Sequence, residues 1–117
     1  MLEKFMEING VVAAGEFSKE DGKLVKSYGE IESDLASLMA ALCGKANSVL
    51  SESIAEYNKH SKRNWDGFKG WALSSGDFSL CVMDNFGVIA ETAKADFNQI
   101  FFQLRMAASY KFEYNNM

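Results

Sequence analysis

The stretch that decides the fold runs from residue 70 to residue 104 and reads GWALSSGDFSLCVMDNFGVIAETAKADFNQIFFQL. It contains three short apolar segments, and the turn-forming sequences SSGD and DNFG separate them. Phe97, Ile100 and Leu104 then follow at helical spacing, which predicts an amphipathic helix. The stretch therefore predicts three strands and a helix from the core of a small domain with both strands and helices.

Two more strands are expected upstream. Residues 11–17 and 24–28 are strand-like segments joined by a loop that contains Asp21-Gly22, a frequent hairpin turn pair. Lys26 lies in the second segment, as is common for a strand at the edge of a sheet. A short helix before them would carry Leu2, Phe5 and Met6 on one face.

A single long helix is expected to run from Asp34 to about Asn58, and it has two apolar faces. We expect the broader face to cover the sheet. Its residues are Leu35, Leu38, Met39, Leu42, Ala46, Val49, Leu50 and Tyr57. The narrower flank consists mostly of small residues, which would let a partner helix approach closely. Its residues are Ala36, Ala40, Cys43 and Ile54.

The composition restricts the class of protein. A chain of 117 residues corresponds to one domain, and 48% apolar residues are enough for a packed core. The net charge of −4 argues against nucleic-acid binding, and the longest apolar run is too short to span a membrane. Cys43 and Cys81 lie in apolar contexts typical of reduced thiols. We therefore expect a cytoplasmic protein that binds neither nucleic acid nor membrane.

The expected elements follow one another in the segments INGVVAAGEF and DGKLV, DLASLMAALCGKA, GDFSLCVMDNFGVIAE and DFNQIF. In the order of these segments the chain resembles the roadblock / dynein-light-chain superfamily, in particular its stand-alone prokaryotic members of poorly defined function. The resemblance implies an α+β, profilin-like three-layer sandwich. Its five-stranded antiparallel sheet would have the order 2-1-5-4-3, with the long helix on one face and the terminal helices on the other. Residues 1–108 would form this single domain, and residues 109–117 a tail that is frayed or docked.

The same resemblance implies a function without catalysis or cofactors. Members of the superfamily are usually homodimeric or heterodimeric scaffolds whose third strands meet edge to edge and whose long helices lie side by side. Some regulate a small Ras-like GTPase, and others organise multiprotein complexes. The dimer interface predicted here comprises Trp71 and Leu73 of the third strand with Ala36, Ala40, Cys43 and Ile54 of the long helix.

Alternatives remain open from the sequence. Trp71 and Ile54 would also fit a role in the core of one chain, and a small-molecule sensor with a pocket between sheet and long helix is the alternative function. His60 and the two cysteines lack the neighbours that a catalytic or haem site requires. The cations Lys59, Lys62, Arg63 and Lys69 fit a solvated helix end better than an anion site. Turn or cap roles account for Asp77, Asp84 and Asp96 better than a metal site does.

Overall fold

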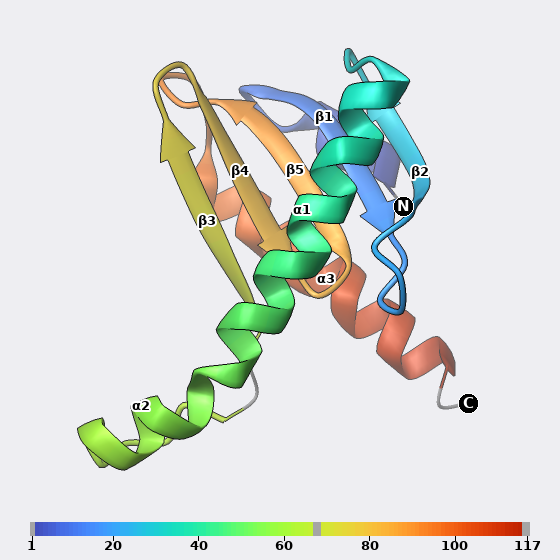
Figure 1. Cartoon of the computed structure of the whole chain (residues 1–117). Coiled ribbons are helices and arrows are strands. Elements are labelled where there is room, and N and C mark those ends of the chain that lie inside the picture. The colour runs from blue at the N-terminus through green and yellow to red at the C-terminus, as the bar shows by residue number, and fades with distance from the viewer. Residues whose placement is uncertain (1, 67–68, 116–117) are drawn as a thin grey trace.

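A five-stranded antiparallel sheet forms the centre of the molecule, with the strand order β2-β1-β5-β4-β3 (Figure 1). The computed structural model describes residues 2–66 and 69–115, with side chains through residue 109. The strands are β1 (Val11–Phe17), β2 (Leu24–Gly29), β3 (Gly70–Ser75), β4 (Phe78–Met83) and β5 (Phe86–Glu91). The expected order of strands is thereby confirmed, and so are their approximate limits.

Helices cover both faces of the sheet. A 3-10 helix, η1 (Leu2–Glu7), and the terminal helix α3 (Phe97–Asn115) lie on one face. Helix α1 (Ser33–Glu52) crosses the other face diagonally, mainly over β1 and β2 (Figure 1). The α+β three-layer sandwich expected from the sequence is therefore the observed fold.

Each face of the sheet has its own core. Under η1 and α3, Phe5, Phe86, Ile100 and Leu104 are fully buried. Under α1, the core consists of Phe17, Ala40, Cys43, Leu80 and Val82. Side chains alternate between the two faces along a strand. Neighbouring residues of β4 such as Leu80 and Cys81 therefore belong to different cores.

The long helix differs from its prediction because it is broken at Ser53. Helix α1 ends at Glu52 and a second helix, α2 (Ile54–Ser61), follows in a new direction (Figure 1). Ser53 Oγ donates a hydrogen bond to the carbonyl of Leu50 at 2.7 Å, and such back-bonding by serine bends helices. None of the residues of α2 is buried, so this short helix extends away from the body as an arm.

Helix α3 begins at a capped end and runs past the predicted domain limit. Asp96 Oδ1 accepts a hydrogen bond from the backbone N–H of Gln99, as an N-cap side chain does. The helix continues through Asn115, so the backbone of residues 109–115 is helical. Docking of the tail through Tyr110, Phe112 and Tyr114 would involve side chains that lie outside the described part of the chain.

Candidate functional site

The side of α1 that faces the sheet is the flank of small residues, and of the large residues assigned to the sheet from the sequence, Met39 packs there as well. Ala36, Ala40 and Cys43 are 5%, 5% and 3% exposed and pack toward the sheet. These three residues are therefore covered by the sheet of their own chain, and their place at a dimer interface stays a prediction. Small side chains let the helix backbone approach the sheet closely, and the larger residues of the sheet supply the bulk of the core. Ile54, the fourth residue of that flank, is half-buried at the start of α2.

The large apolar residues of α1 are left in contact with solvent. Leu35, Leu38, Leu42 and Val49 are 48%, 68%, 51% and 64% exposed. A surface helix normally presents polar residues on such a flank. Four large aliphatic side chains over four turns therefore form an apolar surface of a kind that is common at interaction sites.

The part of the sheet that α1 leaves uncovered also carries exposed apolar residues. The register pairs Trp71 with Val82 and Leu73 with Leu80, so these four side chains lie on the α1 face. Phe78, two residues before Leu80, lies on the same face. Leu73 and Phe78 are about half exposed because α1 crosses the sheet closer to β1 and β2.

The exposed flank of α1 is turned toward β3. The opposite flank carries Gly44 and Ser48, which line a hollow beside Lys19 of the β1–β2 loop. A Cβ added at Gly44 would lie 3.3 Å from the Cα of Gly22 in that loop. We define the exposed large apolar residues on this side of the molecule together as the apolar shelf. It consists of Leu35, Leu38, Leu42 and Val49 of α1, Leu73 of β3 and Phe78 of β4.

The two edge strands of the sheet differ in how they resist pairing with another chain. Strand β2 carries Lys26 and pairs with β1 across an irregularity between Glu16 and Phe17. Charged residues and bulges of this kind protect edges. Strand β3 pairs with β4 without a register shift and contains neither a charged residue nor proline. The unprotected edge is thus the one beside the apolar shelf.

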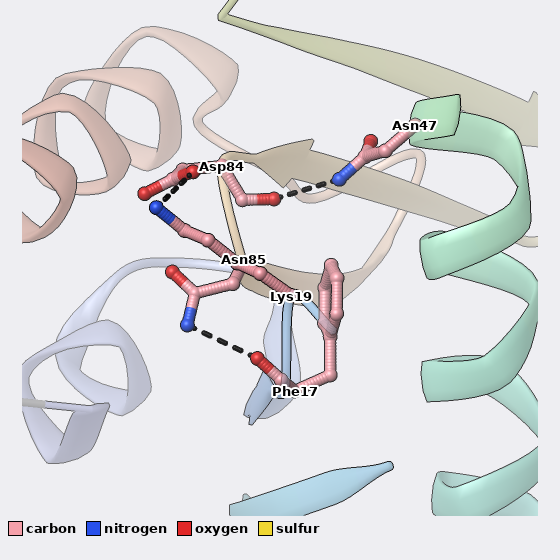
Figure 2. Close-up of polar contacts among 5 residues, drawn as sticks. All are labelled: Phe17, Lys19, Asn47, Asp84 and Asn85. Carbon is pink, nitrogen blue, oxygen red and sulfur yellow. Dashed lines mark hydrogen bonds and ion pairs between the residues drawn. The ribbon is translucent and has the colours of Figure 1, made fainter. Parts of the chain in front are cut away.

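A polar network fixes the position of α1 against the lower end of the sheet (Figure 2). Asn47 Nδ2 donates to the backbone carbonyl of Asp84 at 2.8 Å, and Lys19 Nζ lies 3.0 Å from Asp84 Oδ1. In the same region, Asn85 Nδ2 donates to the carbonyl of Phe17 at 3.0 Å. Asp84 adopts a left-handed backbone conformation, φ 54°, at the β4–β5 turn. These contacts connect α1, the end of β1 and that turn.

Trp71 takes part in this network as well as in the core. Its Nε1 donates to Asn47 Oδ1 at 2.6 Å, and its ring packs against the core under α1. Trp71 is partly buried and helps to cover the core of its own chain, as in the alternative left open by the sequence. The strand residue that remains available to a partner is Leu73.

The cavity beneath α1 is small. It has a volume of about 40 Å³ and its walls are almost entirely apolar. Its lining includes Ala13, Gly15, Ala36, Met39 and Ile89. A cavity of ~150 Å³ is the size that admits benzene. A larger hollow of about 460 Å³ beside the polar flank of α1 is open to solvent, and charges of both signs line it.

The other candidate residues are not brought together. Burial raises the pKa of both the Cys43 and the Cys81 thiol to about 11, and the two residues belong to cores on opposite faces of the sheet. His60 is exposed near Glu56 in α2, with 3.4 Å between His60 Nε2 and Glu56 Oε2. Within residues 2–66 and 69–115, no three metal-ligating side chains cluster, and no helix is long and apolar enough to cross a membrane.

Residues 1–106 match the family model described as "Uncharacterized conserved protein (DUF2173)". The chain belongs to this family. No curated protein matches this DUF2173 chain. Among solved structures, a crystal structure of a Roadblock/LC7 domain from Streptomyces avermitilis is similar, with a TM-score of 0.76 and 16% sequence identity. The similarity covers 96% of this chain and 91% of that one, and it shows that this DUF2173 protein has the roadblock/LC7 fold.

The sequence indicated that β3 is an edge strand, but it did not indicate which flank of α1 packs on the sheet. The missed signal is the spacing of Ala36, Ala40, Cys43 and Asn47, which is as regular as that of the leucines. A polar residue that continues a row of small residues is a sign of close packing against a strand or turn. Asn47 binds Asp84, 37 positions away, and no local pattern predicts that contact.

Proposed function

We propose that this protein is a non-enzymatic, homodimeric platform for binding other proteins. In this proposal the β3 edges of two copies pair, and the apolar shelf of each copy packs against α1 of the other. The observation that supports it most strongly is the exposure of four large apolar residues of α1 beside an unprotected edge strand. The roadblock/LC7 fold agrees with this function, since the resemblance noted from the sequence implies dimeric scaffolds.

A second copy suits the shelf because the shelf combines two different elements. A twofold axis beside β3 places the edge of one strand against the same edge of its partner, and it doubles every contact. The pairing satisfies backbone groups of β3 that otherwise face solvent. It also brings Leu38, Leu42 and Leu73 into contact with equivalent apolar residues of the partner. Each leucine that becomes buried contributes about 1.5–3 kcal/mol to association.

The dimer would offer its two helical faces to a protein partner, with a small Ras-like GTPase as one candidate. On the outer side of α3, Phe102 and Met106 are more than half exposed and lie one turn apart.

We take residues 1–108 as the platform and the cytoplasm as its location. Two free, buried cysteines are consistent with a reducing compartment, and the net charge of −4 favours neither nucleic acid nor an anionic membrane.

The small-molecule sensor has less support. A ligand pocket between the sheet and α1 would need several times the roughly 40 Å³ available there. The lining offers almost no polar surface with which a ligand could be oriented. Co-purification of a bound small molecule would favour the sensor over the platform.

The proposal is tested by changing one flank of α1 at a time. Leu42→Glu places a carboxylate in the proposed interface, whereas Ser48→Glu places it on the opposite flank. Because a twofold interface contains each residue twice, the loss of about 3 kcal/mol or more weakens the dimer roughly 100-fold. Sedimentation velocity should give a monomer for Leu42→Glu and a dimer for Ser48→Glu, with unchanged circular dichroism for both. If Leu42→Glu remains as dimeric as the wild type, the interface is not here.

A further inference from the structure

Clusters of opposite charge stand at the two ends of the α1–α2 unit. Glu30, Glu32 and Asp34 precede or open α1, and Lys59, Lys62 and Arg63 close α2. All six side chains are exposed. None of them forms an ion pair with another residue of the described chain. We call the first three residues the acidic start and the last three the basic end.

The helix dipole accounts for only part of this arrangement. It favours acidic residues in the first turn and basic residues in the last turn, and its effect fades beyond them. Glu30 lies three residues before the first residue of α1, and Arg63 lies two residues after the last residue of α2. Charges so far outside the helices gain little from the dipole.

Symmetry places the two clusters at the same end of the joined sheet in the proposed dimer. Two apolar shelves can meet only if both copies present α1 on the same face of the joined sheet. The twofold axis is then perpendicular to the sheet, so the paired β3 strands and the two α1 helices run antiparallel. Figure 1 shows that α1 starts at the end of the sheet where β3 finishes, and that α2 projects past the end where β3 begins. The arm of one copy and the acidic start of the other therefore lie at the same end.

We infer that the basic end of α2 in each copy binds the acidic start of α1 in the other, so that two charge clamps fix the orientation of the dimer. This inference rests on the proposed homodimer. Two copies of a chain with net charge −4 repel each other at long range, and local complementary charge is what can guide their approach. The shelves supply affinity, whereas the clamps supply orientation and speed of association.

The experiment uses two variants with opposite changes in charge. One carries Lys59→Glu, Lys62→Glu and Arg63→Glu, and the other carries Glu30→Lys, Glu32→Lys and Asp34→Lys. Each variant alone has like charges at both clamps, so its dimer should weaken roughly 100-fold at low salt. A one-to-one mixture restores opposite charges at both clamps, so a heterodimer should form with near wild-type affinity. A dipole effect acts within one chain, and mixing cannot restore it.

A control separates the clamps from total charge. Lys4→Glu, Lys23→Glu and Arg105→Glu change the net charge as much as the first variant does, and these residues lie in η1, the β1–β2 loop and α3. This control should dimerise much better than the first variant. As a second measurement, added salt should slow the association of the wild-type chains, because it screens exposed charges.

The outcomes distinguish this inference from the proposed function. If the wild type is a monomer at all concentrations, the proposed homodimer fails, and the clamps fail with it. If the wild type is a dimer but both triple variants dimerise equally well, or their mixture forms no heterodimer, the homodimer stands and the clamp is wrong. If only the Glu variant of the basic end remains a full dimer, the basic end is free for a different, acidic partner, which also contradicts the clamp.

Discussion

The indole N–H of Trp71 donates a hydrogen bond to the side-chain oxygen of Asn47, with 2.6 Å between the two heavy atoms. This bond connects the edge strand β3 with helix α1 across 24 positions of sequence. The same Asn47 side chain donates to the carbonyl of Asp84. One amide group thereby connects α1 with both β3 and the β4–β5 turn, on the flank of the helix that faces the sheet.

Asn47→Ala should destabilise the fold. The change leaves the Trp71 N–H and the Asp84 carbonyl without their partner in a half-buried position. The expected loss is about 1–3 kcal/mol in the free energy of unfolding, measured by urea denaturation. Ser48→Ala, at the exposed neighbouring position, is the control and should change stability by less than about 0.5 kcal/mol. Equal stability of the two variants would show that the network is unimportant.

Ala40→Leu should also destabilise each chain. Ala40 is buried between α1 and the sheet, so three added carbon atoms force the helix outward at a cost of about 1–3 kcal/mol. The matched control is Ala55→Leu on the exposed arm. Thermal unfolding measures the difference between the two variants. If the small residues of α1 faced a partner, as expected from the sequence, Ala40→Leu would weaken association and leave the stability of the monomer unchanged.

The two edge strands provide a matched pair of substitutions. Leu73→Lys puts a charge on β3, in the proposed interface, and Val25→Lys puts one on β2, where Lys26 already lies. Both side chains are more than half exposed, so neither change should unfold the chain. Light scattering should detect a monomer for Leu73→Lys and a dimer for Val25→Lys. The reverse result would move the interface to the opposite edge of the sheet.

Both thiols should react slowly in the folded protein. The pKa of each is raised from 9.0 to about 11 by burial, so the thiolate fraction near pH 8 is about 100-fold lower than in the unfolded chain. Since the folded state holds these protons more tightly, stability should fall as the pH rises from 9 toward 11. Titration with a thiol reagent, with and without denaturant, measures the difference. Rapid modification of Cys43 or Cys81 in the native protein would contradict their burial.

The sequence predicted most of the fold because its signals are local. The turns at Asp21-Gly22 and Asp84-Asn85 and the apolar strand segments between them determined the strand limits. The face of α1 was mispredicted because hydrophobicity ranks leucine above alanine, whereas close packing on a sheet favours the smaller side chain. The break at Ser53 coincides with a hydrogen bond from its side chain to the carbonyl of Leu50, which helical periodicity does not reveal.

The candidate site was predictable only in part. Leu73 was identified from its place in the third strand, and that strand is an edge. The large residues of α1 were recognised as apolar but assigned to the core, because a sequence does not show that the core already has enough bulk from Phe17, Leu80 and Val82. The contacts of Asn47 join segments far apart in the chain and follow from the tertiary structure alone.

The most direct test of the account is the mass of the wild-type protein in solution. Sedimentation equilibrium at micromolar concentration should give twice the chain mass of 13.0 kDa, and a Leu38→Glu/Leu42→Glu variant should give the single-chain mass. A wild-type protein that stays at 13.0 kDa across the concentration range would contradict the claim that the apolar shelf joins two copies.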